Sequence, residues 1–254
     1  KKEETISSRA LIFTSGSQLN IVKDLFQPKI QKDYKQNAIV CEVLTDLHDS
    51  LTAFERFTDD GILGVIPRKK NSWTLIYSTN LKESGYINEL STSELKDYFQ
   101  NLIGSKCGGI IDIKNLVSYP LKLNFYENFT NKNTCLLGDA AHTLHPIAGQ
   151  SFNLSVRDCL EITKMIKQYS SKGNINFSHI FSDYENNRKK EVQRIVKFTD
   201  FLSTFVHGRN IVKNKFISLF LLAIDSNKTL RIDVIRYLLG VNFSDKLISG
   251  MKNK

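Results

Sequence analysis

Hydrophobic and polar residues alternate along residues 35–79 in a pattern that predicts β-strands. Turn-forming residues such as Asp59, Asp60 and Gly61 separate the apolar runs. Four runs show this alternation: residues 38–44, 52–57, 62–66 and 73–77. Short strands with turns between them favour an antiparallel sheet. A further apolar run at residues 8–14 ends in a small-residue loop and is typical of a buried strand.

The pattern changes after residue 90. Ser91 and Glu94 resemble a capping box, and the apolar residues that follow at helical spacing predict a helix to about Gly104. We expect a strand over residues 116–125 and a short strand over 134–137. Helical spacing then predicts helices over residues 151–168, 211–224 and 229–239, and one long helix or two over residues 177–207.

This order of elements predicts an α+β composite fold, in which an α/β portion is combined with an antiparallel sheet and C-terminal helices. We divide the 254 residues into four segments. The expected boundaries are 1–24, 25–125, 126–168 and 169–254. With 13 glycines and 4 prolines, the chain is expected to consist of regular elements rather than linkers, so disorder and collagen are excluded.

The net charge of +9 comes entirely from the last part of the chain. Residues 1–158 carry 18 basic and 18 acidic side chains, whereas residues 159–254 carry 17 and 8. This excess suggests contact with a membrane surface or an acidic protein, and the alternative is a solvated helical face. The basic side chains at 188–190, with Arg194 and Lys197, could form a phosphate-binding stripe. Because Glu185 and Glu191 interleave with this set, we favour a solvated helix face.

The cysteines and the apolar runs bear on the compartment. The 4 cysteines are far apart and form no C-x-x-C pair, so neither a disulfide framework nor a zinc knuckle is indicated. The most apolar window, residues 216–224, is much shorter than the ~20 residues that cross a bilayer. We therefore expect a reducing compartment and no transmembrane helix.

Residues 135–158 carry the candidate chemistry. A buried strand delivers the carboxylate of Asp139 at its C-terminal end, where α/β sheets bind ligands. Small residues then allow a planar ligand to approach the backbone closely. The segment ends at the start of the 151–168 helix, whose free N–H groups and dipole can stabilise negative charge.

This segment resembles the flavin-binding motif of the FAD-dependent aromatic hydroxylases, the group that includes para-hydroxybenzoate hydroxylase. In that family G-D-A-A-H is followed by Pro, by G-Q-G with an Asn, and by an Asp. The matching residues are Gly138, Asp139, Ala140, Ala141, His142, Pro146, Gly149, Gln150, Asn153 and Asp158. The longer run G-D-A-A-H-T-L-H-P-I-A-G-Q is similar to the ubiquinone-biosynthesis hydroxylases in particular.

The resemblance implies roles for individual residues. Asp139 would hydrogen-bond the ribityl chain of FAD, and Pro146 would lie beside the reactive edge of the flavin as the catalytic position. The turn from Gly149 to Asn153 would offer N–H groups to the pyrimidine side of the ring. The implied cofactor-binding set is Gly16, Gly138, Asp139, Ala140, Pro146, Gly149, Gln150, Ser151, Phe152 and Asn153, with no metal ligands.

The chain departs from the family pattern at three points. Ser151 replaces the second Gly of G-Q-G, which we expect to be costly if that position needs a positive φ. Ser15 stands where the family's second motif has Asp, although Gly16 is kept. No G-x-G-x-x-G follows a strand, and this fingerprint holds the FAD pyrophosphate in such enzymes. We therefore expect a C-terminal portion of a longer hydroxylase, with doubtful activity by itself.

The implied function is hydroxylation of an aromatic ring by FAD, O2 and the reductant NAD(P)H. The implied substrate is a prenylated phenol of ubiquinone biosynthesis. The expected partners are other ubiquinone-biosynthesis proteins and a peripheral membrane contact, without nucleic acid, and the expected location is cytoplasmic, at the inner membrane. Two alternatives stay open: a hydroxylase of a soluble aromatic, and a non-catalytic FAD-domain remnant that acts as an interaction module.

Overall fold

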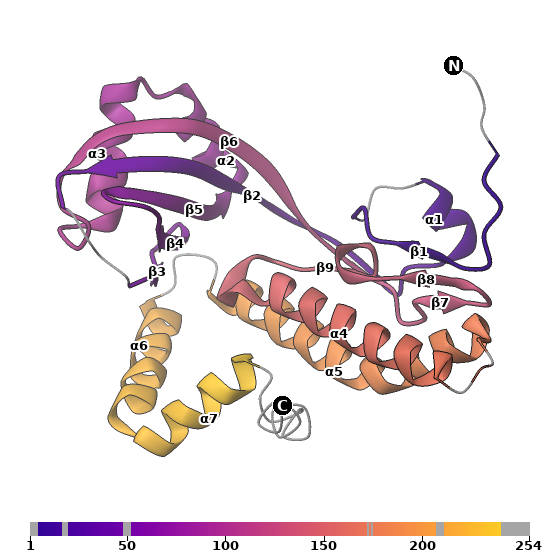
Figure 1. Cartoon of the computed structure of the whole chain (residues 1–254). Helices are drawn as coiled ribbons and strands as arrows, with labels where there is room; N and C mark the ends of the chain where they lie inside the picture. The colour runs from indigo at the N-terminus through magenta and orange to yellow at the C-terminus, as the bar shows by residue number, and fades with distance from the viewer. Residues whose placement is uncertain are drawn as a thin grey trace. The chain divides into compact units, whose positions relative to one another are not determined.

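The computed structural model describes residues 5–16, 20–47, 52–171, 173, 175–206 and 211–239. The chain forms two compact units. Unit 1 comprises Lys1–Ala38 and Ser118–Ser203, and unit 2 comprises Ile39–Val117 and Thr204–Lys254. Figure 1 shows the elements of both units along the chain.

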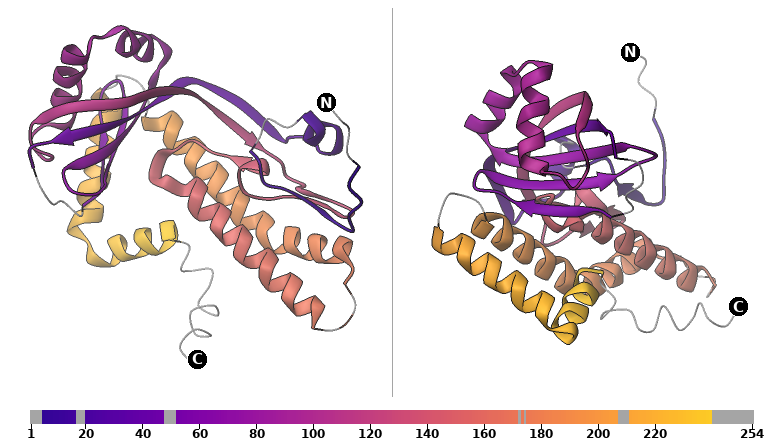
Figure 2. Two further views of the ribbon diagram at one scale, coloured as in Figure 1. Left: turned by 45° about the horizontal axis from the view of Figure 1, so that its top comes forward. Right: turned by 90° about the vertical axis from the view of Figure 1, so that its left-hand side faces the viewer.

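A small mixed sheet and two long helices make up most of unit 1. Strand β1 (Leu11–Phe13) pairs in parallel with β8 (Thr134–Leu136), and β7 (Thr130–Asn131) pairs with β8 in antiparallel fashion. Helix α1 (Asn20–Leu25) contributes the buried Val22 to the same core. The long helices α4 (Gln150–Ser170) and α5 (Phe177–Val206) lie side by side in both Figure 1 and Figure 2.

The strands of unit 2 form a curled antiparallel sheet. Strand β4 (Gly61–Pro67) lies between β3 (Phe54–Phe57) and β5 (Ser72–Asn80), with Phe54 opposite Val65. Strand β2 (Ile30–Thr45) lies next to β5, and β6 (Ile110–Phe125) lies next to β2; each has 16 residues. Strand β2 begins in unit 1, and β6 ends there. The two-residue strand β9 (His142–Thr143) pairs with the end of β6.

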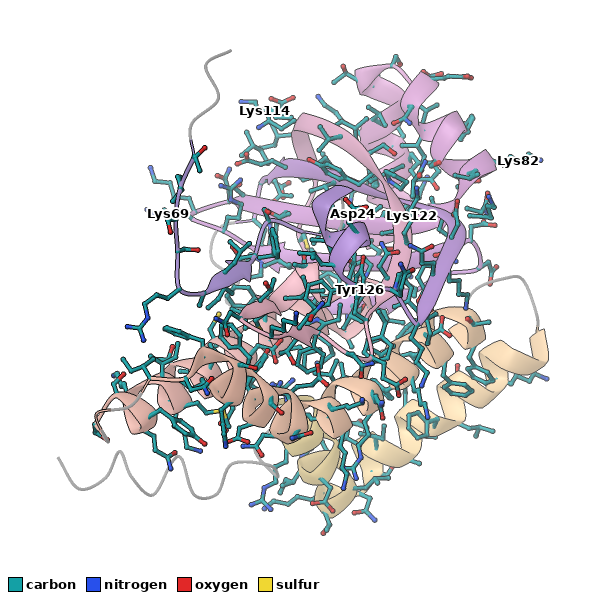
Figure 3. The ribbon with its side chains drawn as sticks, turned by 90° about the vertical axis from the view of Figure 1, so that its right-hand side faces the viewer. Asp24, Lys69, Lys82, Lys114, Lys122 and Tyr126 are labelled. Carbon is teal, nitrogen blue, oxygen red and sulfur yellow. The ribbon has the colours of Figure 1, made fainter. Side chains whose placement is uncertain are left out.

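Helices α2 (Leu81–Glu89) and α3 (Thr92–Ile103) pack against this sheet, because Ile87 and Phe99 share one buried cluster with Leu63. Helices α6 (Ile211–Ser226) and α7 (Lys228–Leu239) follow at the C-terminal side of the unit. Figure 3 shows the side chains of Lys82 and Lys114 pointing outward from unit 2. In unit 1, Tyr126 is 1% exposed and belongs to the core.

The predicted α+β composite fold is confirmed. The capping box is present as predicted: Ser91 accepts the N–H of Glu94, and the Glu94 carboxylate accepts the N–H of Ser91. Helix α2 was not predicted, because it follows β5 without a loop; Asn80 ends the strand and caps the helix by accepting the N–H of Glu83. The short α1, β7 and β9 were also missed.

The predicted C-terminal elements are described only in part. The helix predicted over 177–207 is α5, and its last predicted residue lies outside the described residues, as do residues 240–254 of the predicted C-terminal segment. Among the described residues, no helix combines the length and hydrophobicity needed to cross a bilayer. The functional assignment of the four predicted segments stays a prediction.

Candidate functional site

A cavity of about 440 Å³ opens where three elements of unit 1 meet. They are the ends of β1 and β8 and the first turns of α4. Parallel strands present their carboxyl ends at one edge of a sheet, which is where such sheets bind ligands. The cavity is lined by Thr14, Leu137, Gly138, Asp139, Ser151, Phe152, Ser155 and Cys159.

Asp139 is held at this cavity by its neighbours. It lies in a single 3₁₀ turn, Gly138–Ala140, directly after the buried strand β8. The Ser151 hydroxyl donates a 2.7 Å hydrogen bond to Asp139 Oδ1, and the Thr143 hydroxyl donates to the Asp139 backbone carbonyl at 3.0 Å. One carboxylate oxygen is therefore oriented by Ser151, while the side chain stays exposed to a ligand.

The backbone strain that we expected at Ser151 lies elsewhere. Ser151 is not among the residues of positive φ, whereas Ala148 and Gly149 have φ of 57° and 58°. Gly138 also has a positive φ, of 60°, and a Cβ built there would lie 3.0 Å from Ser155 Oγ. A side chain at residue 138 would therefore be strained and crowded, and the serine at 151 contributes a hydrogen bond.

The start of α4 offers hydrogen-bond donors. Its N-cap residue is Gly149, and glycine has no side chain that could compete for the N–H groups of the first turn. A Cβ at Gly149 would meet no atom within 4 Å, so the space beside this turn is open. Free N–H groups and the positive end of the helix dipole together favour a negatively charged or electron-rich ligand group.

The structure brings part of the predicted set together. Gly138, Asp139, Ser151 and Phe152 line the cavity. The others do not line it: Ala140 and Gln150 are buried, Pro146, Asn153 and Gly16 are half-buried, and Gly149 is exposed. Ser155 and Cys159 also line the cavity and were not predicted. They follow Ser151 at intervals of four residues, and that spacing on a helix places the three on one face.

Behind the cavity, a buried ionic cluster joins the motif to the long helices. His142 Nε2 lies 2.6 Å from Asp158 Oδ2, and both side chains are almost completely buried. Arg188 Nε of α5 donates to Asp158 Oδ1 at 2.8 Å. Glu191 in turn forms ion pairs with both Arg188 and Arg157. Within the described residues, no group of His, Cys, Asp and Glu side chains forms a potential metal site.

This cluster corrects one sequence-based interpretation. We favoured a solvated helix face for the basic side chains at 188–190, yet Arg188 and Glu191 are only 6% and 7% exposed. Arg188 lies four residues after the buried Tyr184 and four before the buried Val192, so it belongs to the buried face of α5. Helical spacing alone would have placed it there.

The cluster also sets the ionisation of Asp158. Burial by itself would raise the pKa of this carboxyl, but the hydrogen bond and charge of His142 and the charge of Arg188 hold the pKa below the ordinary value of 3.8. The folded protein therefore stabilises the charged form, and Arg188 has its own pKa raised by Asp158 and Glu191 against the effect of burial.

Comparison with known proteins decides the family of this chain. A family model described as "FAD binding domain" matches residues 3–199. The chain belongs to this FAD-binding family. It is 25% identical over 253 residues to the ubiquinone biosynthesis monooxygenase COQ6 of Dictyostelium discoideum, covering 82% of this chain and 51% of that protein.

Two further likenesses agree with the family. An uncharacterized protein of Synechocystis sp. is 30% identical over 216 residues, covering 80% of this chain and 50% of that protein. The crystal structure of p-nitrophenol 4-monooxygenase PnpA from Pseudomonas putida shares the fold, with a TM-score of 0.69 and 15% identity over 92% of this chain and 59% of that one. The chain spans about half the length of the curated relatives that it matches.

The cavity fits a flavin cofactor chemically. Asp139 presents a carboxylate suited to sugar-alcohol hydroxyls, and Gly138 allows the backbone of the 3₁₀ turn to stay close to α4. The open side of Gly149 leaves room for a planar ring beside the N–H groups of α4.

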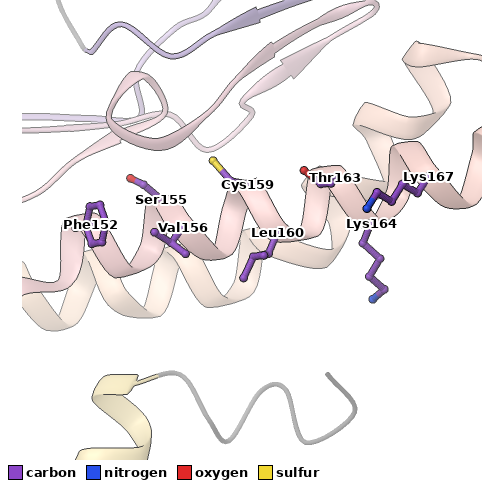
Figure 4. A pocket seen from close by; sticks show the side chains of 8 residues that line it. All are labelled: Phe152, Ser155, Val156, Cys159, Leu160, Thr163, Lys164 and Lys167. Atoms are coloured by element: carbon purple, nitrogen blue, oxygen red, sulfur yellow. The ribbon is translucent and has the colours of Figure 1, made fainter. Parts of the chain in front are cut away.

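A second groove, of about 620 Å³, follows α4 away from the cavity. Figure 4 shows the side chains that line it, from Phe152 to Lys167. Three of them are apolar and spaced four residues apart, with exposures of 76% for Phe152, 40% for Val156 and 56% for Leu160. This exposed apolar stripe begins at the cavity beside Asp139, because Phe152 lines both.

Arg188 is predicted to be essential for stability. Arg188→Met should lower the free energy of unfolding by about 3–5 kcal/mol, because it leaves Asp158 and Glu191 buried with fewer positive partners. Chemical denaturation measures this change. The matched control is Lys190→Met, which removes an exposed lysine of the same helix and should cost no more than about 0.5 kcal/mol. Equal effects of the two substitutions would contradict the role of the cluster.

The lowered pKa of Asp158 predicts a pH dependence. A carboxyl whose pKa is lower when folded stabilises the protein at neutral pH, and this contribution is lost as the pH falls below about 4. Asp158→Asn should therefore weaken the acid dependence of the unfolding free energy, measured by urea titration from neutral to acid pH. Asp97→Asn, at an exposed carboxylate of α3, is the control. If the unfolding free energy of Asp158→Asn fell as steeply with acid pH as that of wild type, this assignment would be wrong.

Proposed function

We propose that this chain forms the flavin-ring side of an FAD-dependent monooxygenase that hydroxylates an aromatic ring. The proposed substrate is a polyprenylated phenol of ubiquinone biosynthesis, and the proposed reductant is NAD(P)H. In this reaction one oxygen atom of O2 enters the ring and the other leaves as water, at the expense of NAD(P)H. The bound FAD supplies the redox and oxygen-transfer chemistry, and the protein supplies position and electrostatics.

One observation carries this proposal. Asp139, Gly138 and Ser151 line a cavity at the start of α4, in a chain of the FAD-binding family. The ubiquinone biosynthesis monooxygenase COQ6 is among its relatives, which supports the choice of a phenolic substrate. Because the chain spans about half of that relative, we assign the activity to the full-length protein and expect the 254 residues alone to retain FAD weakly.

The proposed roles follow from position. Asp139 would accept hydrogen bonds from the ribityl hydroxyls, with its second oxygen held by Ser151. The first N–H groups of α4 would stabilise negative charge on the pyrimidine side of the ring. Pro146 begins the turn that leads into α4, and we propose that it borders the reacting edge of the flavin. No side chain of the chain needs to act as a nucleophile.

We also propose a peripheral membrane contact, because a polyprenylated substrate partitions into the bilayer. Helix α6 exposes four consecutive apolar side chains, Leu219 to Leu222, and α7 exposes Ile232 and Ile235. The positive charge of residues 159–254 suits an anionic surface at the inner membrane. The proposed location is cytoplasmic, with other ubiquinone-biosynthesis proteins as partners.

Asp139→Ala should weaken FAD binding about 10- to 100-fold in the full-length protein, since the loss of a charge-assisted hydrogen bond costs about 1.5–3 kcal/mol. The FAD content after dialysis and a fluorescence titration of the apoprotein measure the effect. Asp97→Ala on α3 controls for the loss of an exposed carboxylate. Equal FAD content in wild type and Asp139→Ala would reject the assignment of the cavity.

The substrate proposal predicts a dependence on the prenyl chain. With a polyprenylated phenol, kcat/KM should exceed that with the same phenol lacking the chain by at least about tenfold, because an apolar chain adds binding energy with each buried methylene. NADH and NADPH oxidation, oxygen uptake and hydroxylated product are measured together. Equal kcat/KM values would favour a soluble aromatic substrate, and FAD binding without NAD(P)H oxidation would favour a non-catalytic module.

A further inference from the structure

His145 is buried next to the proposed flavin turn and has defined partners at both ring nitrogens. Its side chain is 1% exposed. The backbone N–H of Ile147 donates to His145 Nδ1 at 3.2 Å. On the other side of the ring, His145 Nε2 lies 3.0 Å from Oε1 of Gln36, which is itself only 5% exposed. Tyr34 packs edge-on against the imidazole, with ring centroids 5.1 Å apart.

These partners select one protonation state of the imidazole. A ring nitrogen that accepts a hydrogen bond from an amide N–H carries no proton, so His145 Nδ1 is unprotonated. The proton of the neutral ring is then on Nε2, where the amide oxygen of Gln36 accepts it. A doubly protonated ring would direct its Nδ1–H at the N–H of Ile147. The geometry therefore requires the neutral Nε2–H tautomer.

The turn that His145 holds is an unfavourable one. Ile147 is followed by Ala148 and Gly149, both in the left-handed region with φ of 57° and 58°. A left-handed conformation is disfavoured for alanine because its Cβ crowds the following carbonyl. The hydrogen bond from Ile147 to His145 has the two-residue span of an Asx turn, which stabilises such a reversal of the chain.

The other bond of His145 ties this turn to strand β2. Gln36 lies near the point where β2 leaves unit 1. The same end of β2 is joined to α5, because Lys32 and Tyr34 both bond the carboxylate of Asp200. The turn before α4 is thus held by a strand that is itself anchored on α5.

We propose that His145 is a positioning residue that holds the Pro146–Gly149 turn in the conformation that receives the flavin ring. This inference deepens the proposed function and rests on it. His145 acts through Ile147 and Gln36 and need not touch the cofactor. The predicted consequence is that FAD affinity depends on the acceptor at Nδ1 and on the donor at Nε2.

Three variants in the full-length protein separate the two bonds. His145→Ala removes both and should weaken FAD binding about tenfold. His145→Asn keeps an acceptor for the Ile147 N–H, as asparagine does in Asx turns, and should stay within about threefold of wild type. Gln36→Leu leaves His145 Nδ1 as the acceptor for the Ile147 N–H but removes the partner of Nε2. This variant tests the connection between the turn and β2 if His145→Ala does not fold. His179→Ala, at an exposed histidine of α5, is the matched control.

Three readouts decide the outcome: FAD dissociation constants, the visible circular dichroism of bound FAD, and the nitrogen-15 NMR signals of His145. We expect the Nε2–H pattern in NMR, and an altered flavin dichroism in His145→Ala that His145→Asn restores. A purely structural role would lower the unfolding free energy without changing the flavin dichroism.

The inference and the proposed function can fail separately. An Nδ1–H tautomer, or equal FAD affinity and dichroism in wild type and His145→Ala, would overturn the inference alone. A full-length wild-type protein that binds no FAD would refute the proposed function, and the positioning role would fall with it.

Discussion

The burial of the Asp158 carboxylate is the constraint on which unit 1 depends. An ionised carboxylate without solvent needs compensating partners, and it finds them on two different elements: His142 at β9 and Arg188 on α5. Arg188 then requires Glu191, and Glu191 requires Arg157. These ion pairs join the motif loop to α4 and α5.

The cavity follows from that arrangement. With α4 held against α5 through Arg157 and Glu191, the first turn of α4 lies beside the end of β8. Gly138 permits this approach, since any Cβ would press on Ser155. Ser151 can then reach Asp139 and orient its carboxylate. A departure from the family pattern at residue 151 is thus accommodated by a hydrogen bond, with no left-handed backbone to support.

Local signals in the sequence predicted most of the regular elements. The alternation over residues 35–79 and the capping box at Ser91 depend on neighbours in the chain, so they can be recognised without a structure. The motif predicted four of the residues that line the cavity. The partner of His145, by contrast, is Gln36, on a distant strand. A contact between distant segments leaves no periodic signature, which is why Gln36, Thr14 and the ion pair between Arg188 and Asp158 were not predicted.

The parallel ladder of β1 and β8 has a consequence for the order of folding. It pairs Leu11 with Thr134, and more than a hundred residues lie between them. Closing a loop of this length costs chain entropy before the contacts of the ladder can stabilise it. The hairpins β3–β4 and β4–β5 need only local closure. During synthesis the segment 39–117 leaves the ribosome before β8 does. This segment can therefore form its core before β8 is available to pair with β1.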